Sequence, residues 1–185
     1  MENQKIFIND HEAVDLGLSV KWATCNIGAC KPEERGDYFA WGETSPKDVY
    51  TGETYLYYDV ANNQKFIDIG TEISGTEYDA ARKQWGDEWR MPRLVEVEEL
   101  IDECTWEPMK IGELCVCKIT GKNGNSIFLP TDEEFYGHFY TSQYRIDTSD
   151  GEYECDGECY LSCHSGSSYV NVTGGDEVQH CQFDQ

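Results

Sequence analysis

The chain has 185 residues, 39% hydrophobic and 13% aromatic, a composition typical of a folded domain with a substantial core. Its 14 Lys and Arg against 36 Asp and Glu give a formal net charge of -22, which repels phosphate backbones and argues against nucleic-acid binding. Every hydrophobic run is shorter than the roughly 18 residues of a membrane-spanning helix, so no membrane span is predicted. We interpret the charge mainly as a solubility coat, with cation binding or a basic partner as the alternative.

The N-terminus has no basic segment followed by an apolar one, so no signal peptide is predicted. The location is therefore open: extracellular or at the cell surface if a leader was removed, otherwise cytoplasmic. We expect a single domain over residues 1–185, with 1–11 as an N-terminal segment. The nine cysteines leave at least one thiol unpaired. Cys115 and Cys117 are poor partners for each other, because residues two apart in a strand carry parallel side chains.

The first half of the chain is predicted to be mostly irregular. Two short strands at Ala13–Gly17 and Val20–Thr24 flank a turn. Gly28–Glu77 is rich in Gly, Pro and charge, and we expect its aromatic residues to keep it packed. A short helix is predicted at Tyr78–Trp85, because two alanines favour it and Gly86 stops it.

Two tryptophans, an arginine and a proline crowd Trp85–Pro92, which we interpret as a packed junction ahead of a second helix. Arg90 is expected to be a buried, paired scaffold residue rather than a catalyst. The second helix is predicted at Leu94–Cys104, because apolar residues recur there at spacings of three and four.

From Glu113 onward the pattern is typical of strands. Leu114–Ile119 alternates between two faces, Gly121–Asn125 supplies a turn, and Ser126–Pro130 completes a hairpin. Strands, a helical middle and a late antiparallel meander predict an α+β fold with antiparallel sheets, two short helices and long irregular loops. The later strands are predicted at His138–Gln143, Cys159–His164, Tyr169–Val172 and Val178–Phe183.

Four blocks of sequence stand out in chain order: Ala13–Gly28, Gly36–Thr44, Trp89–Pro92 and Gly124–Pro130. Together they resemble the signatures of the Fibrobacter succinogenes major paralogous domain (FISUMP) family. The resemblance implies a C-type-lectin-like fold, similar to that of the formylglycine-generating enzyme. The family is best represented among gut and rumen bacteria, often in secreted or surface proteins, so a bacterial protein of this gut type is expected. It brings no general biochemical activity. The last third departs from the family pattern, at Phe139–Gln143 and again near the C-terminus.

Two groups of residues raise the question of a metal. For the cysteines, packed free thiols are the favoured interpretation. A zinc site would need a tight turn at Asp156-Gly157, because residues four apart in a strand are about 13 Å apart. The acidic residues between Asp147 and Glu158 predict a solvated loop, with calcium as the alternative and no other cofactor expected. The zinc candidates are Cys155, Cys159, Cys163, His164, His180 and Cys181.

The sequence predicts no enzyme. It has no nucleophile elbow, phosphate loop or His-Glu-Xaa-Xaa-His motif, and its four histidines are scattered. Tyrosines are the better lead, since a large apolar face with a hydroxyl suits sugar or protein recognition. Tyr55 and Tyr57 are expected to pack the long irregular segment. The predicted ligand-binding residues are Tyr144 and Arg145, in an expected loop at Gln143–Arg145, and Tyr169 and Asn171, in one at Ser167–Asn171.

The leading hypothesis is a non-catalytic ligand-binding or adhesion module of a bacterial protein, recognising a glycan or protein through C-terminal loops. One alternative is a retroelement-diversified variable display protein, in which substitutions would cluster between Ser167 and Gln182. Another is a metal- or thiol-dependent enzyme of the formylglycine-generating-enzyme-like fold, using Cys163, Cys181 or a metal.

Overall fold

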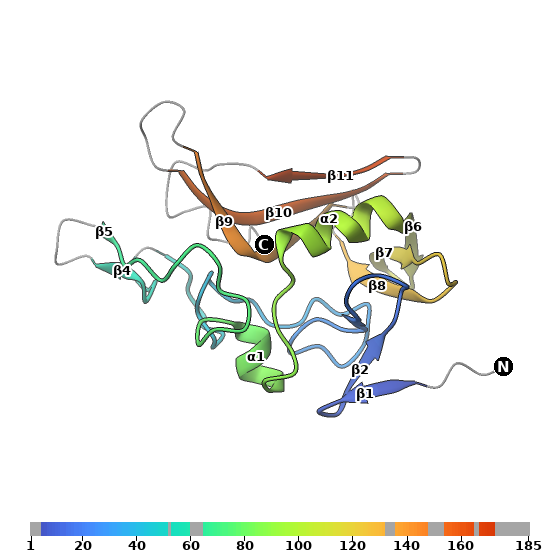
Figure 1. The fold of residues 1–185 in the computed structure, drawn as a ribbon, viewed down its shortest axis with the longest axis horizontal. Helices are drawn as coiled ribbons and strands as arrows, with labels where there is room; N and C mark the ends of the chain where they lie inside the picture. Colours follow the sequence, from blue (N-terminus) through green and yellow to red (C-terminus); the bar gives the residue numbers. More distant parts are fainter. Residues whose placement is uncertain are drawn as a thin grey trace. The chain divides into compact units, whose positions relative to one another are not determined.

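The computed structural model describes residues 5–51, 53–59 and 65–131, together with the backbone of three later strands (Figure 1). For Asp59, Lys65, Phe66 and the three later strands, only the backbone is described. The elements are β1 (Ile6–Ile8), β2 (His11–Val14), β3 (Trp22–Ala23), β4 (Tyr58–Asp59), β5 (Lys65–Phe66), α1 (Ala80–Trp85), α2 (Leu94–Glu103), β6 (Thr105–Ile111), β7 (Leu114–Thr120), β8 (Ser126–Pro130), β9 (Tyr136–Asp147), β10 (Glu154–His164) and β11 (Ser167–Val172).

The predicted α+β class is confirmed. The strands β1, β2 and β3 form one antiparallel sheet, and β6, β7 and β8 form another. A two-stranded antiparallel pair joins β4 to β5, and the last three strands form a sheet in the order β11-β10-β9. Within the described residues, no helix combines the length and apolar character needed to cross a lipid bilayer.

The described residues fall into two compact units. One takes its residues from Met1–Asp37, Arg93–Phe139 and Cys159–Asn171, and the other from Tyr38–Pro92, Tyr140–Glu158 and Val172–Gln185. The expected single domain over residues 1–185 stays a prediction.

The first unit begins with a hairpin that the sequence pattern did not indicate. Ile8 pairs with His11 across a two-residue turn, in which Asn9 and Asp10 both have positive φ. Asn and Asp tolerate this left-handed conformation, and such a turn matches the natural twist of a hairpin. The segment expected only as an N-terminal extension therefore contributes β1. The next predicted pair forms as β2 and β3, with Val14 opposite Trp22, but β2 ends at Val14 rather than Gly17 and β3 is limited to Trp22–Ala23.

The core of the first unit lies between α2 and the sheet of β6, β7 and β8. The predicted apolar stripe of α2 supplies Val97 and Leu100, while Ile101 is only partly buried. Each large apolar side chain that is fully buried contributes roughly 1.5–3 kcal/mol. The buried cluster consists of Leu16, Val97, Leu100, Trp106, Cys117, Ile119 and Ile127.

The hairpin of β7 and β8 forms as predicted, but β6 is an additional strand. Its middle residue Pro108, which cannot donate to a ladder, argues against a strand in the sequence. Because β6 lies at the edge of its sheet, the proline is tolerated. Cys115, Val116 and Cys117 are all buried in succession, so both faces of β7 are covered there, in contrast to the expected alternation.

The turn of this hairpin docks on the loop between β2 and β3. The Nδ2 atoms of Asn123 and Asn125 donate to the carbonyl oxygen of Asp15, at 2.9 and 2.8 Å. A Cβ atom at Gly121 would lie 2.1 Å from the carbonyl oxygen of Leu16, so only glycine permits this approach. The carboxylate of Glu99 on α2 accepts the Ser19 amide at 3.0 Å, which fixes the same loop from the helix side.

Candidate functional site

The predicted ligand-binding residues lie on two strands of one sheet. Tyr144 and Arg145 belong to β9, Tyr169 and Asn171 belong to β11, and their side chains lie outside the described part of the structure. The expected loop at Gln143–Arg145 is wrong for the backbone, since β9 continues to Asp147. No Gly or Pro interrupts the sequence between Gly137 and Gly151, and Tyr and Ile there favour a strand.

The loop expected at Ser167–Asn171 is also wrong for the backbone, because β11 runs from Ser167 to Val172, which confirms the strand predicted at Tyr169–Val172. Strand β10 lies between the two strands in the sheet order β11-β10-β9. The four residues are therefore presented by the outer strands of a three-stranded sheet rather than by loops. The further strand predicted at Val178–Phe183 lies outside the described residues.

The cysteine group at the end of the chain lies along β10, with Cys155, Cys159 and Cys163 on one extended strand. The backbone is extended through Asp156-Gly157, so the tight turn required by a zinc site is replaced by strand. Residues four apart in a strand are separated by about 13 Å, too far to share one ion. The predicted acidic loop is likewise shorter than expected, since its last members lie on β10. Among the described residues, no three His, Cys, Asp or Glu side chains lie close enough to hold a metal.

Cysteine pairing is partly defined. Cys117 is disulfide-bonded, whereas Cys115 is a free thiol. The expectation that these neighbours do not pair with each other is confirmed. Cys25, Cys30 and Cys104 are also free thiols.

In the second unit, a buried ion pair fixes the long irregular segment. The Glu43 side chain is only 3% exposed, and its Oε1 atom accepts from Lys47 Nζ at 2.7 Å and from the Leu56 amide at 2.9 Å. Lys47 Nζ also donates to the carbonyl oxygen of Thr54 at 2.9 Å. It lies 5.3 Å from the ring centroid of Tyr50, a distance at which cation–π attraction contributes.

The predicted packing of Tyr55 and Tyr57 is confirmed. Tyr55 is buried and donates its hydroxyl to the Trp41 carbonyl oxygen at 2.9 Å. Tyr57 makes edge-to-face contacts with Tyr55 and with Tyr78, at centroid distances of 5.7 and 5.4 Å. Burial, followed by the neighbouring Tyr78 and Glu43, raises the pKa of the Tyr57 phenol above its ordinary value, so this ring is a neutral packing element at physiological pH.

The junction at Trp85–Pro92 is held by one buried carboxylate. Asp79 caps α1, with Oδ1 accepting from the Arg82 amide at 3.0 Å. Its Oδ2 atom accepts from the amides of Gly75 and Met91, at 2.7 and 2.9 Å. The helix start, the turn before it and the segment after it are thereby joined at one group.

The aromatic residues of the junction pack as predicted. Trp85 and Trp89 form an edge-to-face pair with centroids 5.1 Å apart. Arg90 is only partly buried, and it donates to Ser74 Oγ at 3.2 Å. The expected burial is therefore wrong, and the hydrogen bond to Ser74 is a scaffold contact, while the expected pairing stays a prediction.

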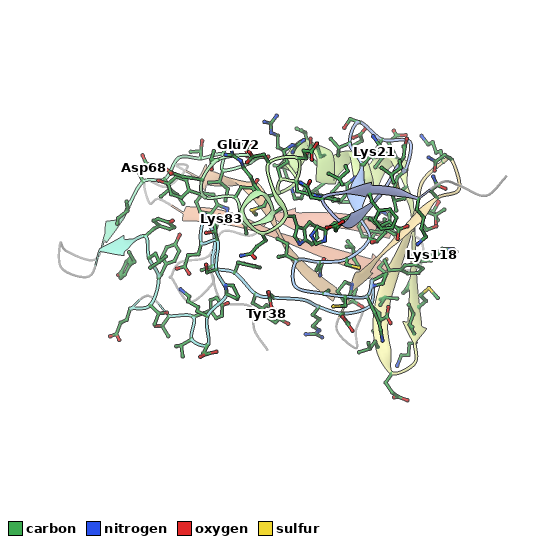
Figure 2. All side chains as sticks on the ribbon, turned by 90° about the horizontal axis from the view of Figure 1, so that it is seen from below. Lys21, Tyr38, Asp68, Glu72, Lys83 and Lys118 are labelled. Atoms are coloured by element: carbon green, nitrogen blue, oxygen red, sulfur yellow. The ribbon has the colours of Figure 1, made fainter. Side chains whose placement is uncertain are left out.

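Several large apolar side chains of the second unit face solvent, which the sequence pattern did not single out. Leu56 is 68% exposed although Glu43 holds its backbone, and Val49, Ile67 and Tyr38 are exposed as well (Figure 2, which labels Tyr38). Isolated exposed apolar residues are common on protein surfaces. They therefore define no site.

The residues of the four sequence blocks make scaffold contacts. Asp15 receives the hairpin turn, Gly36 approaches Ile27, and Met91 binds Asp79. Their side chains and backbone groups are thus used in holding loops together. Comparisons with profiles of known protein families, with curated proteins and with solved structures found no match.

Proposed function

We propose that the chain is a non-catalytic ligand-binding module with a C-type-lectin-like fold of the FISUMP type. Its ligand is a glycan or a protein, and Tyr144, Arg145, Tyr169 and Asn171 contribute to binding. The observation that carries the proposal is that different parts of the chain supply the scaffold contacts and the candidate binding residues. The motif blocks serve as scaffold, while these four residues lie on a sheet that follows them.

The contacts between blocks support the fold assignment. Asn125, from the fourth block, donates to Asp15 in the first block at 2.8 Å. Asp37, from the second block, donates its amide to the Ile27 carbonyl of the first block at 2.7 Å. Blocks distant in the sequence therefore meet within the first unit, which is expected when a family shares a scaffold rather than an active site.

The chemistry of the four residues supports recognition. Tyrosine offers a rigid apolar ring for stacking together with a hydroxyl for hydrogen bonding. Arg145 adds a planar guanidinium that binds carboxylates in two-point geometry, as found on acidic sugars and acidic peptides. With a net charge of -22, the protein repels acidic ligands elsewhere, so binding of such a ligand would have to be local.

A glycan array and a surface-display peptide library, probed with the purified chain, test the proposal. We expect a specific ligand whose binding is weakened at least about tenfold, or about 1.4 kcal/mol, by Tyr144→Ala or Tyr169→Ala. Tyr38→Ala is the matched control: its side chain is exposed, and the hydrogen bond from Tyr50 goes to its backbone carbonyl, which the substitution retains. Binding that is unchanged in both test variants, or reduced equally in the control, would count against the assigned residues.

A further inference from the structure

The first unit contains two free thiols that flank a single tight turn. The amide of Ala29 donates to the carbonyl oxygen of Asn26 at 3.1 Å, which closes a four-residue turn. Gly28, its third residue, has φ +82, the conformation that a type II turn requires. Cys25 directly precedes this turn and Cys30 directly follows it, and neither is in a disulfide.

The chain reverses direction at this turn, because the first and fourth residues of a β-turn have Cα atoms less than about 7 Å apart. Cys25 and Cys30 are the next residues along the two arms, and a disulfide spans Cα atoms roughly 4.4–6.8 Å apart. The sequence separation of five residues across the turn is therefore suited to an intramolecular bridge.

Contacts behind the turn hold it in this shape. Asn26 Nδ2 donates to the Arg35 carbonyl oxygen at 3.0 Å, and the Asp37 amide donates to the Ile27 carbonyl oxygen at 2.7 Å. The Cys30 amide is bound by the Glu34 carboxylate at 2.8 Å. Because both arms of the turn are already fixed, bringing the two sulfur atoms together costs little additional conformational entropy.

The two thiols differ in accessibility. Cys30 is exposed, whereas Cys25 is partly buried, and the Thr24 hydroxyl lies 3.7 Å from its sulfur. Burial raises the pKa of the Cys25 thiol; Thr24 lowers it, while nearby Glu34, Cys30 and Glu12 raise it further. Cys30 is therefore the thiol that meets a reagent first, and Cys25 is the neighbour placed to react second.

We propose that Cys25 and Cys30 form a redox-active dithiol, which small-molecule disulfides such as oxidised glutathione convert into an intramolecular disulfide. In the first step the Cys30 thiolate attacks the reagent, forms a mixed disulfide and releases one glutathione thiolate. In the second step the Cys25 thiolate attacks the Cys30 sulfur and releases the other. The two cysteine protons end on the two glutathione molecules, so two protein thiols are oxidised and one reagent disulfide is reduced.

The test is peptide mapping of the native protein equilibrated in glutathione buffers of increasing oxidising strength, after trapping of free thiols by alkylation. We expect a peptide in which Cys25 is linked to Cys30, while Cys104, a partly buried thiol, stays alkylatable and serves as the internal control. Cys30 that carries glutathione without a link to Cys25, a link from either cysteine to another one, or no reaction at Cys30 would each overturn the proposal.

A pair of matched variants separates the two roles. In Cys25→Ser the resolving thiol is missing, so Cys30 should accumulate glutathione as a stable mixed disulfide. In Cys30→Ser the exposed thiol is missing, so Cys25 should remain largely unmodified. Equal glutathione on Cys30 in the native protein and in Cys25→Ser would contradict the second step. If a variant unfolds, the linked peptide of the native protein still decides the question.

Discussion

At Glu43 the chain buries a carboxylate that no sequence search would select among 36 acidic residues. Its partner Lys47 follows four residues later, but the backbone there is not helical, so the spacing alone carries no information. What defines the pair is the contact with Leu56 and the surrounding tyrosines. Of these tyrosines, Tyr55 was predicted as a packing residue, because burying an aromatic ring is the ordinary way to hold a long irregular segment, whereas the role of Tyr50 was not.

Replacing Glu43 with Ala should destabilise the second unit. The Lys47 ammonium and the Leu56 amide would lose their shared acceptor, and breaking a buried pair costs about 3 kcal/mol. Because the Lys47 side chain remains 21% exposed, we expect a loss of about 2 kcal/mol. Urea denaturation measures the free energy of unfolding, and faster hydrogen exchange at the Leu56 amide would localise the change.

The control for this substitution is Glu12→Ala, which removes the exposed ion pair with Lys5. The side chains of Lys5 and Glu12 are 66% and 24% exposed, so the loss should stay below about 1 kcal/mol. Equal losses in the two variants would contradict the structural role assigned to Glu43.

Cys104 provides a pH-dependent prediction. Burial, then Glu103 and Glu99, raise the pKa of its thiol above the ordinary 9.0, while Lys122 lowers it. The folded protein thus holds this proton more tightly than the unfolded chain does. The resulting stability is fully present below pH 9.0 and is lost as the pH rises through the folded-state pKa. In urea denaturation across this range, Cys104→Ser should lose stability less steeply than the native protein. Parallel curves for the two proteins would contradict this origin.

At the scale of elements, local signals determined what could be predicted. Both helices were predictable, because two alanines and a stop at Gly86 mark the first and an apolar stripe marks the second, although the cap at Asp79, which sets the start of α1 at Ala80, was missed. The hairpin of β7 and β8 was predictable from its turn. Strand β6 was missed because Pro108 argues against it locally, and only pairing with β7 at the sheet edge makes it a strand. The extent of β9 was missed because Gln143–Arg145 was assigned to a loop on side-chain chemistry, although no turn residue there would end the strand.

Helix α1 should depend strongly on Asp79. In Asp79→Asn, the amide group keeps only one acceptor oxygen for three backbone N–H groups, so at least one buried donor loses its partner. Hydrogen bonds to charged groups contribute about 1.5–3 kcal/mol, and we expect a loss of about 2 kcal/mol. Chemical denaturation followed by tryptophan fluorescence, to which Trp85 and Trp89 contribute among the five tryptophans, is the measurement.

Asp87→Asn is the matched control for this prediction. It removes the ion pair between Asp87, whose side chain is 83% exposed, and Arg82 on the same helix. Exposed pairs contribute little, so the change should be about 0.5 kcal/mol or less. A loss as large as that of Asp79→Asn would show that charge near the helix, rather than capping, is responsible.

At the scale of the whole molecule, the net charge of -22 sets the electrostatics. Like charges repel one another more strongly when the chain is compact, and salt screens this repulsion. The thermal midpoint of unfolding should therefore rise as sodium chloride is increased from about 0.01 M to 0.15 M, where the screening length falls from about 30 Å to 8 Å. Sucrose in place of salt separates screening from general solute effects. A midpoint that falls with salt would mean that favourable ion pairs dominate instead.

The candidate site could be predicted less completely than the fold. The sequence blocks pointed to a scaffold, and residues such as Asp15 and Met91 are indeed occupied by structural hydrogen bonds. Side-chain chemistry alone selected Tyr144, Arg145, Tyr169 and Asn171. Residue types do not define a binding site completely, because recognition also depends on the shape of the ligand. The strand predicted at Tyr169–Val172 already includes Tyr169 and Asn171, whereas the strand position of Tyr144 and Arg145 was missed.

The docking of the hairpin turn on the β2–β3 loop has a consequence for the order in which the protein can form. Asp15 and Asn125 are 110 residues apart, so the carbonyl of Asp15 meets its donor only after most of the chain exists. At about 5–20 residues per second, a ribosome needs roughly 6–22 s to add those residues. During this interval the nascent β2–β3 segment lacks both Asn125 and the close approach of Gly121 to Leu16. On a ribosome stalled before Gly121, Leu16 in the loop between β2 and β3 should therefore still be accessible to chaperones.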